Sequence, residues 1–173
     1  MADRPLAVLG ATGYTGQFVL ERARALDLPV RLVGRRRQAL EELAREGEEV
    51  FVGDSRDPAS LAAAFEGAYA VGSCAGPFLE LGLAPVEEAI AAGAHYLDTS
   101  GEQAFARLIH QELGARAERA GVVVVPAFGF DYVPGDLAAR LAAEGLEPLD
   151  EVVVAYWISN GSMSAGTLKT IRT

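Results

Sequence analysis

Short apolar runs rich in β-branched residues alternate along this chain with segments in which apolar residues recur every three or four positions. A spacing such as Leu61, Ala64 and Phe65 predicts an amphipathic helix, whereas the runs between such segments predict strands. The predicted strands are residues 6–9, 30–33, 50–52, 69–73, 95–97, 122–125 and 152–158. Strands that alternate with helices through short joints predict an α/β fold, with a doubly wound, mostly parallel sheet and helices on both faces. Residues 122–125 are apolar throughout, which predicts a strand buried on both faces.

The first joint, GATGYTG at residues 10–16, contains three glycines at intervals of three. It lies at the carboxyl edge of the predicted sheet, where ligands of open α/β folds bind. Gly10 suits the sharp turn out of the strand, Gly13 lets the backbone approach a diphosphate, and Gly16 lets the helix pack on the strand. The helix directs free N–H groups and its positive dipole end toward the phosphates. We therefore expect a dinucleotide site, with a tight structural turn as the alternative. Its candidate residues are Gly10, Thr12, Gly13, Tyr14, Thr15 and Gly16.

The chain contains one lysine, and this excludes two related kinds of site. A P-loop ends in Gly-Lys-Ser/Thr, but Lys169 is far from the glycine loop. No tyrosine has a lysine four positions later, so the Tyr-x-x-x-Lys pair of short-chain dehydrogenases is absent as well. The two histidines, His95 and His110, have no second His or Cys at metal-ligand spacing, so no metal site is predicted.

The composition limits the classes of partner. The 173 residues, half of them apolar, can form the core of one domain or slightly more. The formal net charge of −9 argues against nucleic acid and anionic membranes, which both require a basic face. The sequence shows no leader pattern, no apolar run of membrane-spanning length and a lone cysteine, Cys74. We therefore expect a cytoplasmic protein with a small-molecule substrate and without membrane insertion. Whether it forms a homo-oligomer is left open.

Three arginines follow the second predicted strand and indicate which dinucleotide binds. An NAD site usually has Asp or Glu at the end of this strand, where it accepts hydrogen bonds from the ribose hydroxyls. Here Gly34 is followed by Arg35, Arg36 and Arg37, about 20 residues past the last loop glycine. A guanidinium can bind a 2′-phosphate through two hydrogen bonds, whereas a carboxylate would repel it. We expect NADP(H), with Arg35 as the main contact and Arg36 as the second; a solvated helix start is the alternative.

Two further strand ends supply candidate cofactor contacts. After the third strand, Asp54 is placed to accept a hydrogen bond from the adenine amino group, with Ser55 beside it. A turn or N-cap role for Asp54 is the alternative, and Asp57-Pro58 predicts the start of the next helix. After the fourth strand, a Gly-Pro turn lies beside the diphosphate and the nicotinamide ribose. The candidate contacts there are Cys74, Ala75, Gly76 and Pro77. For Cys74 a packing role is favoured over a nucleophilic one.

Five motifs resemble, in order and spacing, the NADP-binding domain of saccharopine dehydrogenase-like oxidoreductases, which include saccharopine reductase and the trans-acting enoyl reductases. They are GATGYTG, GRRRQALEEL, AGPF, AGAHYLDTSGE and GFDYVPGDL, which span nearly all of residues 5–145. The resemblance implies a Rossmann domain over residues 1–145 and the start of a mixed α/β substrate domain over residues 146–173. It also implies an NADPH-dependent oxidoreductase that transfers hydride to a C=N or C=C bond in the cleft between the two domains.

Hydride transfer needs both walls of such a cleft, because the substrate must be held and water excluded. We therefore expect these 173 residues alone to be incomplete and inactive. A module that senses NADP(H) and regulates a partner without chemistry is the alternative, since a fold alone does not establish activity.

Polar residues in the two later motifs are candidates for the substrate cleft. Asp98, Ser100 and Glu102 follow the fifth predicted strand, where they could orient the nicotinamide ribose or a substrate amine. Asp131 and Tyr132 follow the sixth strand at the same edge. The alternative is that Ser100 is an N-cap with Glu102 in the first helical turn. No residue stands out as the proton donor, so the catalytic residues are left unassigned.

Overall fold

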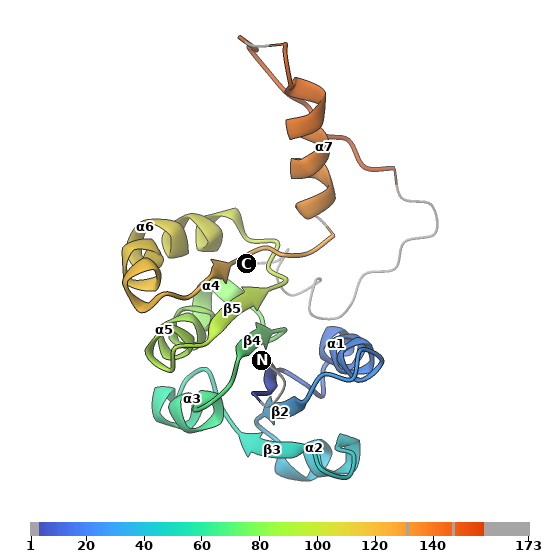
Figure 1. Ribbon diagram of the computed structural model, residues 1–173, viewed down its shortest axis with the longest axis vertical. Coiled ribbons are helices and arrows are strands. Elements are labelled where there is room, and N and C mark those ends of the chain that lie inside the picture. Colours follow the sequence, from blue (N-terminus) through green and yellow to red (C-terminus); the bar gives the residue numbers. More distant parts are fainter. Residues whose placement is uncertain (1–3, 131, 147, 158–173) are drawn as a thin grey trace.

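The computed structural model describes residues 4–130, 132–146 and 148–157 (Figure 1). Within them six strands form one parallel sheet in the order β3-β2-β1-β4-β5-β6. The strands are β1 (Leu6–Leu9), β2 (Val30–Gly34), β3 (Glu49–Val52), β4 (Ala70–Ser73), β5 (His95–Asp98) and β6 (Val124–Val125). The chain starts in the middle, runs to one edge at β3 and continues from β4 to the other edge. This order confirms the predicted doubly wound Rossmann fold.

Helices cover both faces of the sheet (Figure 1). They are α1 (Tyr14–Arg24), α2 (Arg37–Leu43), α3 (Pro58–Phe65), α4 (Phe78–Leu81), α5 (Leu83–Ala91), α6 (Gln103–Ala120) and α7 (Val133–Ala143). Side chains of α1 and α2 pack on one face, and those of α3, α5 and α6 pack on the other. The predicted start of α3 is confirmed, because Asp57 is its N-cap and Pro58 its first residue.

Two hydrophobic clusters fill the spaces between the sheet and its helices. Neighbouring residues of a strand point to opposite faces, so β1 divides its side chains between the clusters. Val8 packs with Leu20 of α1 and Leu40 of α2, whereas Ala7 and Leu9 belong to the cluster that includes α3, α5 and α6. Burial on both faces keeps β1 in the centre of the sheet. The glycine loop that follows β1 is thereby held over the middle of the carboxyl edge.

The structure corrects two strand predictions. The sixth strand contains only Val124 and Val125, and it lies at the sheet edge with the preceding Val123 59% exposed, so it is not buried on both faces. The apolar run of residues 152–157 is not a strand, and its Trp157 is 94% exposed. A strand needs a neighbour for its backbone groups, and no described strand pairs with this run or with the outer side of β6. Residue 158 lies outside the described residues.

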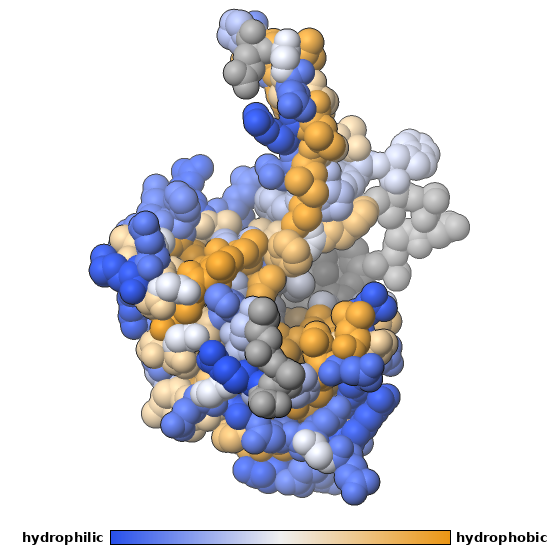
Figure 2. Space-filling view, in the orientation of Figure 1, coloured by the Kyte–Doolittle hydropathy of each residue, from blue (hydrophilic) through white to orange (hydrophobic). Residues whose placement is uncertain are grey.

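Helix α7 extends away from the sheet, at the top of the molecule in Figure 1. Its apolar residues Leu137 and Leu141 are exposed, and Figure 2 shows an apolar band along the helix. Gly135, which lies against the Tyr156 side chain, is the buried residue of α7. The helix therefore lies outside the two hydrophobic clusters that hold the sheet.

Candidate functional site

The glycine loop turns between β1 and α1 at the centre of the carboxyl edge. Gly10 has a φ of +82°, a left-handed conformation that residues with a Cβ rarely adopt. A Cβ on Gly10 would also lie 3.1 Å from the carbonyl carbon of Cys74. Hydrogen bonds fix the loop, since the Gly10 amide donates to Val33 O and the Gly13 amide to Gly10 O, both at 2.9 Å. The close approach of Gly10 to Cys74, and the hydrogen bond from the Cys74 amide to Leu9 O, place the loops after β1 and β4 side by side.

Gly16 allows α1 to pack directly on this loop. A Cβ at Gly16 would overlap the Gly10 carbonyl oxygen and lie 3.0 Å from the Cα of Ala11. Both obstacles are backbone atoms, so neither can move aside on its own. The predicted roles of Gly10 in the turn and of Gly16 in close packing therefore fit the geometry.

Among the described residues, no side chain caps the N-terminus of α1. Gly13 is the N-cap without a side-chain hydrogen bond, and the first turn contains no acidic residue. Around it Tyr14 is exposed, and Thr12 and Thr15 are half-buried. The amides of a first helical turn have no acceptor within the helix, so this end is suited to bind an anion. The contact of these residues with a diphosphate stays a prediction.

Arg35 and Arg36 directly follow β2 and are exposed. Arg36 is the N-cap of α2, whereas Arg37 is its first residue and pairs with Glu41 one turn later (Nη1–Oε1 3.5 Å). Arg35 and Arg36 form no ion pair with any described residue. Cations at a helix N-terminus oppose the helix dipole, so the fold gains nothing from them there. Two guanidinium groups are thus available at the strand end where the sequence predicts the 2′-phosphate contact.

Asp54 and Ser55 follow β3, beside the end of β2. Asp54 Oδ1 accepts the Arg56 amide at 3.0 Å, and the Asp54 amide donates to Ser60 Oγ at 3.0 Å. These bonds stabilise the turn that leads into α3, which is the alternative role that the sequence left open for Asp54. The contact of Asp54 with the adenine amino group stays a prediction.

The loop after β4 begins at Cys74, whose amide donates to Leu9 O at 2.8 Å. Ala75 and Pro77 are half-buried and Gly76 is exposed. Burial, with the negative charge of Asp98 as a smaller cause, raises the pKa of the Cys74 thiol to about 11. Such a thiol is a poor nucleophile at neutral pH, which supports the packing role.

Asp98, the last residue of β5, is 2% exposed, and its oxygens bind backbone amides. Oδ1 accepts the amides of Ser100 and Ala127, both at 2.9 Å, and the Asp98 carbonyl oxygen accepts the Phe128 amide at 2.7 Å. The other carboxylate oxygen is buried without a hydrogen-bond partner among the described residues, and so is the Ser100 hydroxyl. Asp98 therefore joins the loops after β5 and β6.

Glu102 connects the loop after β5 to helix α4, and Tyr132 connects the loop after β6 to the loop after β5. The Glu102 carboxylate accepts the amides of Phe78 and Leu79 at 2.8 and 2.7 Å, so it caps the adjacent helix α4. The Tyr132 hydroxyl donates to Gly101 O at 3.2 Å. The alternative that Ser100 is the N-cap of this helix, with Glu102 in its first turn, is wrong, because Glu102 itself is the N-cap of α6. Asp131 lies outside the described residues.

Two residues absent from the predicted site, Ser73 and Tyr96, lie beside Asp98. Ser73 is paired with Asp98 in the register of β4 and β5, and Tyr96 shares its face of β5. Both hydroxyls are buried, and the Tyr96 hydroxyl lies close to the side chains of Ser73 and Asp98. Burial and the charge of Asp98 raise the pKa of Tyr96 well above its ordinary value, so this hydroxyl stays protonated. The polar residues at alternate positions of HYLD are the sequence feature that could have indicated this cluster.

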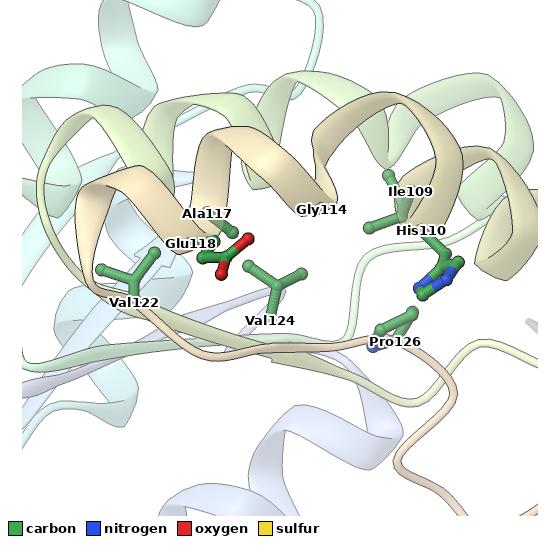
Figure 3. Close-up of a pocket in the computed structure, with 8 residues that line it drawn as sticks. All are labelled: Ile109, His110, Gly114, Ala117, Glu118, Val122, Val124 and Pro126. Atoms are coloured by element: carbon green, nitrogen blue, oxygen red, sulfur yellow. The ribbon is translucent and has the colours of Figure 1, made fainter.

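A separate groove lies between α6 and β6, at the outer edge of the sheet (Figure 3). It encloses about 360 Å³ and is lined by Ile109, His110, Gly114, Ala117, Glu118, Val122, Val124 and Pro126. None of these is a predicted site residue.

Among residues 4–130, 132–146 and 148–157, no group of three or more His, Cys, Asp or Glu side chains could hold a metal ion. Within the same ranges, every helix is too short or too polar to cross a membrane.

Comparison with known proteins identifies the family. The family described as NAD(P)H-binding matches residues 10–149. The human saccharopine dehydrogenase-like oxidoreductase is 31% identical over an alignment of 152 residues, which covers 76% of this chain and 35% of that protein. A Mycobacterium tuberculosis protein named as a trans-acting enoyl reductase is 32% identical over 181 residues, which covers 96% of this chain and 43% of that protein.

The structural comparison agrees with this result. Saccharopine dehydrogenase (L-Glu forming) from Saccharomyces cerevisiae is 21% identical, with a TM-score of 0.67 over 82% of this chain and 31% of that one, which shows a shared fold. This chain spans less than half the length of each of the three proteins. The chain belongs to the NAD(P)H-binding family, and its predicted resemblance to the saccharopine dehydrogenase-like oxidoreductases is confirmed.

Proposed function

We propose that this chain is the NADP(H)-binding domain of an oxidoreductase that transfers hydride to a C=N or C=C bond. One observation carries the proposal. The N-terminus of α1, which no described side chain caps, lies next to the end of β2. That strand end carries Arg35 and Arg36, two guanidinium groups without an ion-pair partner among the described residues. Because β1 and β2 are adjacent, a diphosphate at α1 brings the adenosine ribose close to the end of β2.

In this arrangement the first half of the sheet binds the adenosine half of the cofactor. The amides of the first turn of α1 bind the diphosphate, and Gly10 and Gly13 keep side chains out of its approach. Arg35 binds the 2′-phosphate through two charge-assisted hydrogen bonds, with Arg36 as the second contact. Asp54 at the end of β3 is the nearest candidate for the adenine amino group.

The second half of the sheet, from β4 to β6, binds the nicotinamide half. Bound NADPH supplies the hydride, and the loop of residues 74–77 orients the ribose that carries the nicotinamide. We assign the substrate and the proton donor to a second domain that begins within residues 146–173. Two observations support that domain: this chain spans less than half of its relatives, and Leu137 and Leu141 expose an apolar stripe on α7.

Arg35→Ala tests the cofactor assignment against a matched control two residues away. Loss of hydrogen bonds to the 2′-phosphate should weaken NADPH binding by about 1.5–3 kcal/mol and NADH binding far less. Arg37→Ala removes the same charge from a side chain that pairs with Glu41, so both affinities should stay close to wild type. Titration followed by the fluorescence of the reduced nicotinamide measures both ligands. Equal affinity of the wild-type protein for NADPH and NADH contradicts the assignment.

An NADP(H) sensor without chemistry is the second candidate. It needs only the cofactor site, and it agrees with the burial of Asp98 and Ser100, which offer no exposed side chain for chemistry on this chain. Assay of the complete reading frame with NADPH and imine or enoyl substrates separates the two functions. Substrate-dependent loss of absorbance from NADPH supports the oxidoreductase, whereas binding without turnover supports the sensor.

A further inference from the structure

The chain is strained where it leaves β6. Ala127 has a φ of +58°, in the left-handed region that residues other than glycine seldom occupy. The residue is 8% exposed, so solvent does not supply its hydrogen bonds. Its amide instead donates to Asp98 Oδ1 at 2.9 Å, and the next amide, of Phe128, donates to Asp98 O at 2.7 Å. One residue of β5 therefore binds both amides of the strained turn.

The same carboxylate also shapes its own loop. Asp98 Oδ1 accepts the Ser100 amide, and the chain that follows reaches Gly101, whose carbonyl accepts the Tyr132 hydroxyl at 3.2 Å. The loops after β5 and β6 are thus tied together at two places. Phe128 and Phe130, just beyond the turn, expose 51% and 63% of their surface. Together the two loops form one wall over the β5–β6 half of the carboxyl edge.

A buried carboxylate is costly unless its hydrogen bonds compensate for lost hydration. Asp98 is 2% exposed, and one of its two carboxylate oxygens has no hydrogen-bond partner among the described residues. The side chain next to it in the sheet register, Ser73, is also buried without a partner there. An apolar residue here would leave the buried amides of Ser100 and Ala127 without their acceptor. The two amides that Oδ1 holds are therefore the clearest physical reason for an acid at residue 98.

We propose that Asp98 is a positioning residue for the nicotinamide half of the cofactor site. It acts through the turn at Ala127: by holding the strained amide, it keeps the loop after β6 in the position where its residues border the nicotinamide. The inference rests on the proposed NADP(H) site, because β4 to β6 form the half of the sheet that receives this part of the dinucleotide. Asp98 itself stays buried and does not contact the ligand.

The first arm of the test needs no ligand. Asp98→Ala removes the acceptor for the Ala127 amide, so exchange of this amide and that of Phe128 with deuterated water should accelerate about tenfold or more. Asp98→Asn keeps an oxygen in place of Oδ1 and should retain the protection. Unchanged exchange in Asp98→Ala overturns the inference, because the carboxylate then does not hold the turn.

The second arm compares two ligands by calorimetry. NADPH contains both halves of the cofactor, whereas adenosine 2′,5′-bisphosphate contains the adenosine half alone. Asp98→Ala should weaken NADPH binding about tenfold, the scale of one or two hydrogen bonds, and leave the bisphosphate unchanged. Asp98→Asn should bind both ligands nearly as the wild type does. Equal weakening of both ligands overturns the inference, since the loss then belongs to the whole fold.

A double variant tests the role of strain. Glycine adopts a φ near +58° without penalty, so Ala127→Gly in the Asp98→Ala background should recover part of the NADPH affinity. If Asp98→Ala does not fold, as judged by circular dichroism, the NADPH affinities of the double variant and of Asp98→Asn are compared with that of the wild type instead. No recovery in a folded double variant overturns the inference. A wild-type protein that binds neither ligand contradicts the proposed function instead, and the exchange arm then still reports whether Asp98 holds the turn.

Discussion

Gly16→Ala is the substitution whose effect follows most directly from the geometry. The added Cβ would overlap the carbonyl oxygen of Gly10 and lie 2.9 Å from its carbonyl carbon. Both atoms belong to the backbone of the glycine loop, and Gly16 is buried in the first turns of α1. The helix must therefore shift away from β1, and its N-terminus must shift with it.

Two effects of opposite sign determine how much Gly16→Ala changes the free energy of unfolding. Alanine favours a helix interior over glycine by about 1 kcal/mol, whereas overpacking a rigid contact costs about 1–3 kcal/mol. A direct overlap with backbone lies at the upper end of that range, so we expect a net loss of about 1–2 kcal/mol. Gly114→Ala in α6 is the matched control, because a Cβ there meets no atom within 4 Å. It should gain about 0.5–1 kcal/mol from helix propensity alone.

Urea unfolding followed by circular dichroism measures both free energies of unfolding. The account predicts that the two alanine variants differ by about 1.5–3 kcal/mol, with Gly16→Ala the less stable. Gly16→Ala should also weaken NADPH binding, since the amides that face the diphosphate move with the helix. If both variants gain stability equally, α1 does not pack on the glycine loop as described, and the reasoning is refuted.

Three further predictions concern single side chains. Glu48 accepts two hydrogen bonds from Arg24 (2.7 and 2.6 Å), which lower the pKa of Glu48 below its ordinary 4.5. Glu48→Gln should therefore lose about 1.5–3 kcal/mol in urea unfolding at pH 7, and this difference should vanish as the pH falls below 4.5 through the folded-state pKa. With a thiol pKa of about 11, Cys74 should react with iodoacetamide far more slowly than free cysteine at pH 8, and faster as the pH rises. A Cβ at Gly13 would lie 3.1 Å from the Gly10 carbonyl oxygen, so Gly13→Val should lower the melting temperature while circular dichroism still shows a folded protein. The variant should abolish NADPH binding in calorimetry, because its side chain blocks the approach to the diphosphate; unchanged affinity would show that the loop is only a turn.

The parts of the fold that follow from local pattern could be predicted from the sequence. The period of apolar residues distinguishes strands from helices, and the intervals between Gly10, Gly13 and Gly16 indicate where the first turn and the close helix contact lie. Asp57 and Pro58 mark a helix start through their own backbone preferences. Each of these properties is a feature of a few neighbouring residues, so it is visible without the rest of the chain.

The edge of the sheet could not be predicted in the same way. Residues 122–125 and 152–157 have the composition of buried strands, yet the first forms a two-residue edge strand and the second no strand. Whether an apolar run becomes a strand depends on a neighbour that pairs with its backbone. That neighbour is a property of the assembled sheet, and composition does not reveal it.

For the candidate site, the sequence predicted where residues lie in the fold better than it predicted which contacts they make. The sequence places Asp98 and Glu102 correctly at the carboxyl edge, but their contacts are long-range. Asp98 binds the amide of Ala127, 29 residues later, and Glu102 caps a helix that starts 24 residues earlier. Such partners become apparent only when β4, β5 and β6 lie side by side. Ser73 and Tyr96 were missed for the same reason, because their burial next to Asp98 depends on the sheet register.

Mapping of amide chemical shifts on titration with NADPH tests the central claim most directly. The account predicts that the largest shifts fall on residues 10–16, on Arg35 and Arg36, and on the loop of residues 74–77. These three segments lie at the ends of β1, β2 and β4, which are adjacent in the sheet. Shifts confined to the groove between α6 and β6, around His110 and Glu118 (Figure 3), or no shifts at saturating NADPH, would contradict the claim that the glycine loop binds the dinucleotide.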